Sequence, residues 1–420
     1  MHITIAEGAS ISNIGSMALI ENAIKIARLK HPNCHITILS QNSAKVSAAI
    51  SKSITAYHIE FRDDLFVFPK GNKINKIRWL LRTSFLILYL RIIQNFTYKP
   101  YKFLSGKKAQ LLRAIANSEF IYCIGAERIN DIYYKTAYLS LEALSIYEKM
   151  GSKLVHMSLT IGPVFYRSTK RKAVKVLNNS HAIFVRDQKS YDLLTKLSIT
   201  TPLILNSYDI AILQSPLPNP ENLLNQLGIS PGFIGVSAIA WSFRKAHGTA
   251  RQPEYNKALA ETLDYIIEKY HHNIVFTPTV VGDYKTDDVE ASMRIYELMK
   301  NKDKVIIIKR LLTPGELAAV FSQCKFSIVT RMHAAILCTA AGCKPIIAIN
   351  YLYKLREYMK NIDFENYSID IDYINTADLK QLVKNMYQDY NENFARLTTN
   401  IQKMRKSLLN DINRLANPKA

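Results

Sequence analysis

The sequence predicts an α/β protein built from two doubly wound domains. Short apolar segments rich in β-branched residues alternate with segments of helical periodicity, which is typical of a parallel sheet covered by helices on both faces. The alternation occurs twice and is interrupted at 214–220, where three prolines exclude a helix interior and a central strand. With 420 residues, the chain is long enough for two such domains.

The first domain is expected to span residues 1–212. Its predicted strands are 3–6, 35–39, 120–124, 153–157 and 182–185. Between the first strand and the first helix lies a short polar loop, Ser12-Asn13-Ile14-Gly15. Loops at this position, after a parallel strand and before a helix, are where doubly wound domains bind ligands.

The second domain is expected to span 225–375. Its predicted strands are 233–237, 273–276, 304–308, 326–329 and 345–349. The segment Thr313-Pro314-Gly315-Glu316 predicts a helix start, with a capping box and a proline at the first helical position. Residues 376–420 are helical and charged, and we expect them to pack back on the domains. Two such Rossmann-like domains facing a cleft form the GT-B-like architecture.

The charge and the cysteines restrict the class of function. The formal net charge of +21 attracts anions, and two acid-free segments, 65–118 and 149–186, carry many of the basic residues in the first half. Few aromatic residues interleave these basic runs and no nucleic-acid-binding module is recognisable, so we expect no nucleic-acid partner. Five unpaired-looking cysteines and no secretory leader favour a cytoplasmic chain.

One apolar segment, 79–93, admits two interpretations. Only eight uncharged residues separate Arg82 from Arg91, too few for a transmembrane helix, which needs about 20. The segment is either a buried helix of the first domain or a basic amphipathic helix that lies on an anionic membrane surface. The acid-free flanks fit the second interpretation.

The segment 326–336 carries the clearest chemical signal. A short apolar strand ends and a helix begins at once, so Arg331 and His333 lie at the carboxyl end of a strand and the amino end of a helix. Backbone N–H groups and the helix dipole favour an anion there. Arg331 adds a guanidinium that can grip carboxylate or phosphate, and His333 adds a group that exchanges protons near neutral pH. A structural ion pair and a packed histidine are the alternative.

These residues and others resemble the polysaccharide pyruvyltransferase family. The carboxyl-terminal signature is carried by Thr330-Arg331-Met332-His333-Ala334, by Ala341-Gly342-Cys343-Lys344-Pro345, and by the following strand with Tyr351 and Lys354. Weaker matches are Asn13-Ile14-Gly15, Ile161-Gly162-Pro163, Val185-Arg186-Asp187 with Ser190, Asp209, and Asp287-Asp288. The sequence departs from the family pattern at Ser12, at Ser16 and at Gly125-Ala126-Glu127, which puts the acceptor site in doubt.

The resemblance implies a metal-independent transferase without a cofactor. Its donor substrate would be phosphoenolpyruvate, and its acceptor a sugar diol on a precursor of a cell-surface glycan such as an exopolysaccharide, capsule or lipopolysaccharide. Pyruvate would be transferred as a cyclic ketal with release of phosphate. The acceptor is expected to be a lipid-linked oligosaccharide, reached from the inner membrane face through the basic first half. The oligomeric state is unknown.

The resemblance also assigns roles to residues. Arg331 and Arg186 would hold the donor's carboxylate and phosphate, and His333 would be the acid or base. We expect substrate binding by Lys354, Tyr351, Asn13, Gly15, Ser16 and His247, with the loop 12–16 facing the acceptor. Arg186 and Lys354 could instead be surface residues, and His247 a loop histidine without a role.

Two other interpretations remain open at this point. A GT-B glycosyltransferase with a nucleotide-sugar or other phosphorylated sugar donor would share the architecture and use Arg331 and Lys354 to grip a diphosphate. An inactive relative that only supports a membrane complex is the third possibility. Asp370-Ile371-Asp372 resembles the D-x-D of metal-dependent glycosyltransferases, but its polar surroundings favour a solvated loop or edge strand.

Overall fold

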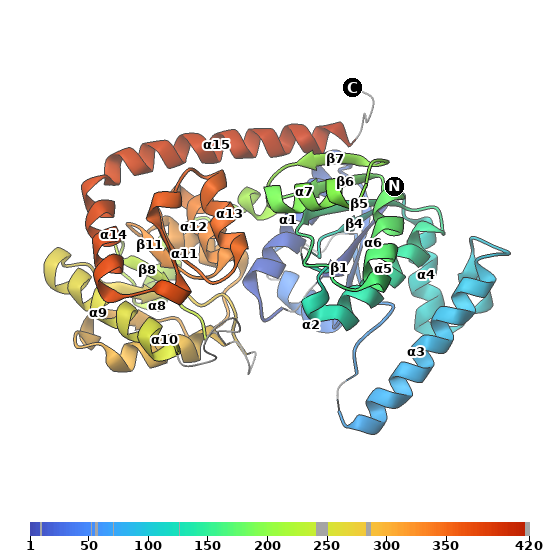
Figure 1. The fold of residues 1–420 in the computed structure, drawn as a ribbon, viewed down its shortest axis with the longest axis horizontal. Coiled ribbons are helices and arrows are strands. Elements are labelled where there is room, and N and C mark those ends of the chain that lie inside the picture. Colours follow the sequence, from blue (N-terminus) through green and yellow to red (C-terminus); the bar gives the residue numbers. More distant parts are fainter. Residues whose placement is uncertain are drawn as a thin grey trace. The chain divides into compact units, whose positions relative to one another are not determined.

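The structure is a computed structural model that contains two parallel β-sheets (Figure 1). It describes residues 1–8, 11–51, 53–54, 58–69, 71–125, 127–240, 251–282 and 287–415. The strands are β1 (His2–Gly8), β2 (His35–Ser40), β3 (Ile59–Asp63), β4 (Phe120–Cys123), β5 (Lys153–Leu159), β6 (Ala182–Val185), β7 (Leu203–Asn206), β8 (Ile234–Ser237), β9 (Ile274–Phe276), β10 (Val305–Ile307), β11 (Ser327–Val329), β12 (Ile346–Asn350) and β13 (Ser368–Asp370).

Helices follow most of the strands, as the alternating pattern predicts. Those before residue 220 are α1 (Ile14–Lys30), α2 (Ser43–Ile50), α3 (Lys73–Ile93), α4 (Gly106–Asn117), α5 (Tyr134–Glu148), α6 (Arg167–Asn178) and α7 (Gln188–Lys196). The later ones are α8 (Pro220–Leu227), α9 (Gln252–Tyr270), α10 (Asp288–Leu298), α11 (Pro314–Ser322), α12 (Met332–Gly342), α13 (Tyr353–Asn361), α14 (Thr376–Gln388) and α15 (Tyr390–Arg414).

The chain divides into two compact units. The first contains 1–11, 19–210 and 408–420, and the second contains 12–18 and 211–407. The expected domains were 1–212, 225–375 and 376–420. Two short segments therefore belong to a different unit than these limits predict. Residues 12–18 join the second unit because the Ile14 N–H donates to the Thr279 carbonyl at 2.9 Å, and the end of α15 from Leu408 joins the first.

Each unit has the strand order of a doubly wound domain. The first sheet runs β3-β2-β1-β4-β5-β6-β7 and the second runs β10-β9-β8-β11-β12-β13, with every pair parallel. The order reverses between β1 and β4 in the first sheet and between β8 and β11 in the second. Ligands of doubly wound domains bind outside the carboxyl ends of the strands at this switch point. The two switch points are therefore the places to search for function.

The helix that follows β11 is apolar on nearly all sides. Eight residues of α12 are buried, from Met332 to Ala340 with the exception of His333. A helix without a polar face has to be enclosed by the protein, so its position is fixed by packing on both flanks. This packing holds the first turn of α12, with His333, firmly at the switch point of the second sheet.

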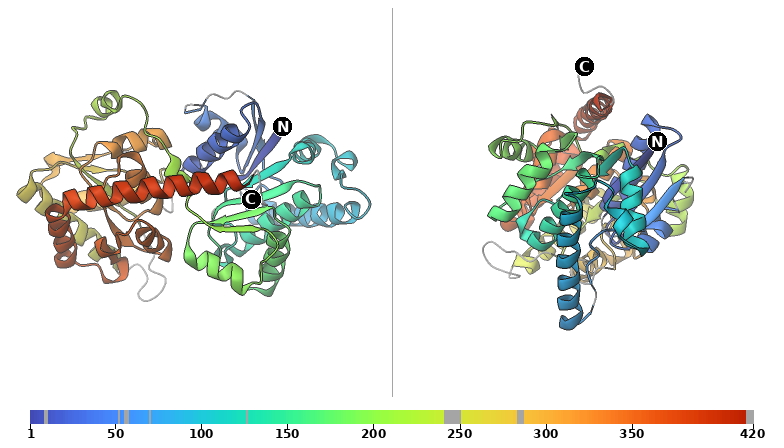
Figure 2. Two further views of the ribbon diagram at one scale, coloured as in Figure 1. Left: turned by 90° about the horizontal axis from the view of Figure 1, so that it is seen from above. Right: turned by 90° about the vertical axis from the view of Figure 1, so that its right-hand side faces the viewer.

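The helix α3 is the exception to compact packing in the first unit. Only Thr83 and Leu90 of its 21 residues are buried, and the helix extends away from the sheet of its own unit (Figures 1 and 2). The interpretation of segment 79–93 as a buried core helix is therefore wrong. Among the described helices, none is both long and apolar enough to cross a bilayer.

Candidate functional site

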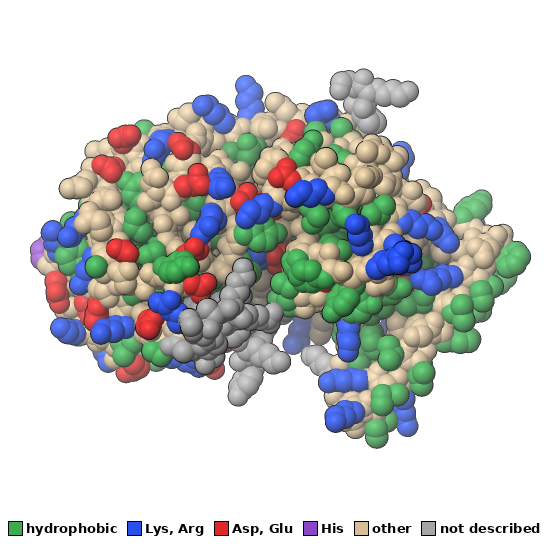
Figure 3. Space-filling model, viewed as in Figure 1, with side chains coloured by type: hydrophobic (Ala, Val, Ile, Leu, Met, Phe, Trp, Pro, Cys, Tyr) green, Lys and Arg blue, Asp and Glu red, His purple; other side chains and the backbone are tan. Residues whose placement is uncertain are grey.

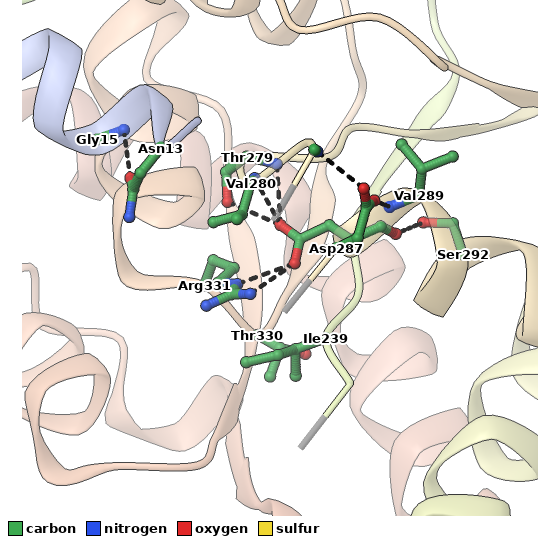
Figure 4. Close-up of polar contacts among 12 residues, drawn as sticks. Asn13, Gly15, Ile239, Thr279, Val280, Asp287, Val289, Ser292, Thr330 and Arg331 are labelled. Atoms are coloured by element: carbon green, nitrogen blue, oxygen red, sulfur yellow. Dashed lines mark hydrogen bonds and ion pairs between the residues drawn. The ribbon is translucent and has the colours of Figure 1, made fainter. Parts of the chain in front are cut away.

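The candidate site of the second unit lies at the switch point between β8 and β11. Arg331, separated from the end of β11 by Thr330, is the N-cap of α12, and its side chain turns toward the start of α10 (Figure 4). There its Nη2 and Nε donate to Asp288 Oδ1 at 2.6 and 3.1 Å. The pair is well shielded, since the Arg331 side chain is 15% exposed and that of Asp288 is 0% exposed. A buried guanidinium is thus fixed at the carboxyl edge of the sheet.

Asp288 is held as firmly as it holds Arg331. Its Oδ2 accepts hydrogen bonds from the N–H groups of Thr279 and Val280 and from the Thr279 hydroxyl, at 2.9 to 3.1 Å. Burial raises the pKa of the Asp288 carboxyl, whereas Arg331 and the two N–H groups oppose this rise. The pKa of Arg331 is raised because Asp288 and Tyr351 outweigh the opposing effect of burial. Arg331 therefore keeps its positive charge in a place with little water.

The amino-terminal loop belongs to the same site. Asn13 caps α1, with its Oδ1 accepting from the N–H groups of Gly15 at 2.9 Å and Ser16 at 3.3 Å (Figure 4). Asn13 also pairs with Val280 in an isolated antiparallel bridge. The loop is consequently attached to the segment that carries Thr279 and Val280, which in turn binds Asp288. Its predicted role toward the acceptor stays a prediction.

Gly15 and His333 are in direct contact. A Cβ built on Gly15 would stand 2.2 Å from Cγ and Nδ1 of the His333 imidazole, closer than any real Cβ approaches another atom. Gly15 is therefore required by space rather than by backbone conformation. The half-buried imidazole lies against the start of α1 on one side and in the first turn of α12 on the other. His333 is held between two helix amino termini.

Further polar groups line the same edge of the second sheet. Tyr351 follows β12 and hydrogen-bonds to the Arg331 side chain, and half-buried Lys354 lies in the first turn of α13. Asn350 Oδ1 and Ser237 Oγ, at the ends of β12 and β8, are buried and have no hydrogen-bond partner within the described part of the chain. Buried polar atoms without partners are costly unless water or a ligand satisfies them. This edge of the sheet therefore offers two buried polar atoms that water or a ligand would satisfy.

Arg186 belongs to a different network, in the first unit. Its guanidinium, 3% exposed, donates from Nε to the Thr160 hydroxyl at 2.7 Å and from Nη1 to Asp209 Oδ2 at 2.5 Å. The neighbouring Asp187 caps α7 and binds Thr160 and Ser190. Arg186 is therefore not a surface residue paired with Asp187, and its predicted contact with the donor stays a prediction.

His247 and Asp370 are the remaining residues considered in the sequence analysis. His247 lies outside the described residues. Asp370 ends the edge strand β13 and pairs with Arg356, so the edge strand is the correct one of the two interpretations given for this segment. No group of three or more His, Cys, Asp or Glu side chains suited to a metal ion occurs in the ranges that the structure describes.

The chain is similar to one known protein family and to an individual protein of polysaccharide biosynthesis. The family model described as polysaccharide pyruvyl transferase matches residues 13–353, which include Asn13, Asp288, Arg331, His333 and Tyr351 but not Lys354. The amylovoran biosynthesis protein AmsJ from Erwinia amylovora is 23% identical over 407 residues, which cover 93% of each chain.

Solved structures support the same architecture. The UDP-GlcNAc 2-epimerase from Methanocaldococcus jannaschii has a TM-score of 0.53 and 13% identity, with coverage of 96% of this chain and 91% of that one. Sucrose-phosphate synthase from Thermosynechococcus elongatus has a TM-score of 0.53 and 8% identity, with coverage of 97% and 95%. At such low identity these matches show the fold alone. They confirm the predicted GT-B-like class of two Rossmann-like domains.

Proposed function

Because the chain belongs to the polysaccharide pyruvyl transferase family, we propose that it transfers pyruvate from phosphoenolpyruvate to a sugar diol. The family makes it a transferase of polysaccharide biosynthesis, and the relative from Erwinia amylovora, an amylovoran biosynthesis protein, agrees with this. The family does not by itself establish phosphoenolpyruvate as the donor or a cyclic ketal as the product, and we propose both. The observation that carries it is the buried Arg331–Asp288 pair beside His333 at the switch point of the second sheet.

The proposed reaction makes specific demands on the site. Two hydroxyl oxygens bond to C2 of phosphoenolpyruvate, the bond between C2 and the phosphate oxygen breaks, and the methylene carbon gains a proton to become a methyl group. Of the two hydroxyl protons, one balances the proton gained by carbon and the other leaves with phosphate. The donor is a small anion with a carboxylate and a phosphate, so the site needs fixed positive charge and a group that exchanges protons.

The second unit supplies both requirements. The buried guanidinium of Arg331 can bind a carboxylate or phosphate, and low local polarity strengthens that attraction. The amino termini of α1 and α12 favour negative charge at the same edge of the sheet. His333, between these termini, is placed to give a proton to the methylene carbon or to take one from a hydroxyl. Tyr351 and Lys354 would contact the phosphate from the end of β12. We propose that no metal ion or cofactor takes part.

Phosphate release tests the proposal. Purified protein is incubated with phosphoenolpyruvate, with and without a mixture of diol-containing glycan precursors, and phosphate is measured together with pyruvate ketal by mass spectrometry. Phosphate and ketal in equal amounts, both dependent on the glycan, would support the proposal. Consumption of a nucleotide sugar such as a UDP-hexose, with phosphoenolpyruvate untouched, would support a GT-B glycosyltransferase instead.

We further propose that the enzyme works at an anionic membrane surface, where a lipid-linked acceptor would be found. The support comes from α3, whose exposed apolar residues follow helical spacing along one face. These residues, each at least 50% exposed, are Ile74, Ile77, Leu80, Leu81, Phe85, Leu88 and Ile92. Lys73, Lys76, Arg78 and Arg82 accompany them, and no acid occurs between 65 and 118. Figure 3 shows the apolar and basic side chains side by side along this helix.

The attachment of α3 to the rest of its unit leaves this face available. Arg91, near the carboxyl end of the helix, donates to the buried Glu142 of α5 at 2.7 and 2.8 Å. Beside it, Phe85 and Tyr89 of α3 and Phe103 line an apolar hollow of about 490 Å³. A large exposed apolar surface with a basic rim fits lipid acyl chains below anionic headgroups.

A further inference from the structure

The first sheet has a polar pocket at its own switch point. Glu7 lies near the end of β1 and Arg128 lies in the loop after β4, the two strands between which the order reverses, and Asp64 lies just after β3. Together with Gln41, Phe66 and Ser140 they line a cavity of about 30 Å³. The family signature contains none of these residues, and the roles assigned above do not use them.

The backbone turns Glu7 into this pocket. Its φ of 65° is unusual for a residue other than glycine, and the register of β1 with β2 shifts between Ile5 and Gly8. The Glu7 carboxylate accepts from the Gly125 N–H and the Ser140 hydroxyl, and its main-chain oxygen accepts from Arg128 Nη2 at 3.5 Å. The buried Oε1, in contrast, has no hydrogen-bond partner in the described part of the structure. One acceptor atom of the pocket is therefore available to a ligand.

The side of the cavity formed by Asp64 and Phe66 is held in place by Gln41. Gln41 donates from Nε2 to Asp64 Oδ2 at 2.8 Å and to the Phe66 carbonyl at 3.1 Å, and its Oε1 accepts from the Phe68 N–H at 2.9 Å. All polar groups of the Gln41 side chain thus hold the segment 64–68 in place. Asp64 and Phe66 are consequently fixed against the cavity rather than free to collapse into it.

The lining selects the chemistry of the ligand. Two carboxylates would repel a phosphate or carboxylate, while Arg128 would repel an ammonium group or a metal ion. A neutral group that both donates and accepts hydrogen bonds satisfies both sides, since it can donate to Glu7 and accept from Arg128. The volume is enough for one or two oxygen-sized groups, because a water molecule needs about 10–15 Å³. A hydroxyl or hydroxymethyl group fits this description.

We propose that this pocket binds a sugar hydroxyl of the acceptor, with Glu7 Oε1 as the hydrogen-bond acceptor and Arg128 as the donor. That the ligand is a sugar rests on the proposed function. That the pocket prefers a hydroxyl group follows from the residues that line it. The pocket then selects acceptors, and the site around Arg331 and His333 binds the donor.

Glycoside binding tests the proposal. Saturation-transfer NMR at pH 8 with methyl β-D-galactoside, methyl β-D-mannoside and methyl β-D-glucoside is applied to the full chain and to Glu7→Gln. Glutamine keeps the shape, but one of its two terminal atoms becomes a donor, so it cannot bind Gly125, Ser140 and the ligand as the carboxylate does. The matched control is Glu119→Gln, an exposed carboxylate at the amino end of β4 that pairs with Lys153 at 3.7 Å.

We expect at least one glycoside to bind to the natural protein and to Glu7→Gln about tenfold more weakly, with Glu119→Gln unchanged. Should Glu7→Gln not fold, Arg128→Lys, which changes the proposed donor, probes the same pocket with the same expectation. An unchanged dissociation constant in both variants, or no binding of any glycoside to the natural protein, would overturn the proposal. The melting temperature of the natural protein is measured in parallel with and without phosphoenolpyruvate. If phosphoenolpyruvate does not raise it, the assignment of the donor is refuted, but the hydroxyl pocket is not, because Glu7 lies outside the proposed donor site.

Discussion

The α-carbon of Gly15 lies against the imidazole of His333, so closely that no larger residue fits at position 15. This contact connects two segments that are more than 300 residues apart in the sequence. In this chain the amino-terminal loop therefore forms one side of the histidine's surroundings. The position of the imidazole depends on this loop as much as on its own helix.

Gly15→Ala should displace His333. The added Cβ would require the imidazole to move, which costs about 1–3 kcal/mol of stability and displaces the group that we propose exchanges the proton. We expect kcat to fall at least about a hundredfold. Gly315→Ala is the matched control in the same unit, because its Cβ would meet other atoms only at 3.8 Å or beyond. Equal activity of the two variants would show that the contact has no functional role.

Arg331→Lys should weaken the binding of phosphoenolpyruvate with little loss of fold. Lysine keeps the positive charge near Asp288 but loses the planar fork. We expect KM for phosphoenolpyruvate to rise about 10- to 100-fold. Arg331→Met should in addition lower stability by about 3–5 kcal/mol, because Asp288 stays buried without its partner. Arg310→Lys, in an exposed pair with Glu316, provides the control, and a similar KM in both lysine variants would argue against anion binding by Arg331.

His333→Asn should separate chemistry from binding. If the imidazole transfers a proton, kcat falls about 10²- to 10⁴-fold, while the dissociation constant of phosphoenolpyruvate, measured by calorimetry, changes little. His271→Asn controls for the loss of a histidine, since His271 is the exposed C-cap of α9 with a φ of 56° that asparagine also tolerates. Unaltered kcat in His333→Asn would exclude it as the acid or base.

The exposed face of α3 should bind anionic membranes. In flotation with vesicles of phosphatidylcholine and phosphatidylglycerol we expect recovery of the natural protein, and much less with phosphatidylcholine alone. Leu81→Ser with Phe85→Ser should reduce binding at least tenfold, since each removes an insertable side chain. Leu298→Ser changes a leucine of α10 that is also more than half exposed, and it should have no effect. Equal recovery with both lipid mixtures would contradict the membrane proposal.

Two buried groups should make stability depend on pH in opposite directions. Burial raises the pKa of Glu7 to about 7, with Arg128 opposing and Asp64 assisting. Stability from this group is present below pH 4.5 and is lost as pH rises toward 7. Burial lowers the pKa of His156 to about 4, so its contribution is lost as pH falls from 6.5.

The effects of Glu7 and His156 on the free energy of unfolding offset each other. The informative quantity is therefore the difference in this free energy between Glu7→Gln and the natural protein. We expect the variant to gain up to about 3 kcal/mol in free energy of unfolding, relative to the natural protein, between pH 4.5 and 8. Urea denaturation at several pH values measures it, with the exposed Glu119→Gln as control. A difference that does not vary with pH would mean that folding does not raise the pKa of Glu7.

The sequence predicted ten of the strands because they are short apolar segments rich in β-branched residues, including the half-buried edge strand β10. It missed the edge strands β3 and β7, and it gave an edge strand at Asp370, where β13 ends, only as one of two alternatives. An edge strand has a neighbour on one side only and carries more polar residues, as Glu60 and Arg62 in β3 illustrate. The capping box at Thr313 is confirmed, with Glu316 donating its N–H to the Thr313 hydroxyl at 3.2 Å and accepting from the Thr313 N–H at 2.7 Å.

The site was only partly predictable for a similar reason. Arg331 and His333 follow a clear strand and begin a helix, so local pattern places them. The partner of Arg331 could not be assigned, because Asp288 is 43 residues away and reaches it only through the folded sheet. Glu7 gave no signal, since its φ and its cavity depend on β4 and α5. The place of the loop 12–16 beside His333 was likewise a matter of tertiary structure.

A crystal structure of the protein soaked with phosphoenolpyruvate tests the central claim most directly. We predict density for the ligand at the carboxyl edge of the second sheet, with a carboxylate or phosphate oxygen within hydrogen-bond distance of the Arg331 guanidinium and the methylene carbon facing His333. Density for phosphoenolpyruvate elsewhere, with Arg331 and His333 not in contact with it, would contradict the account.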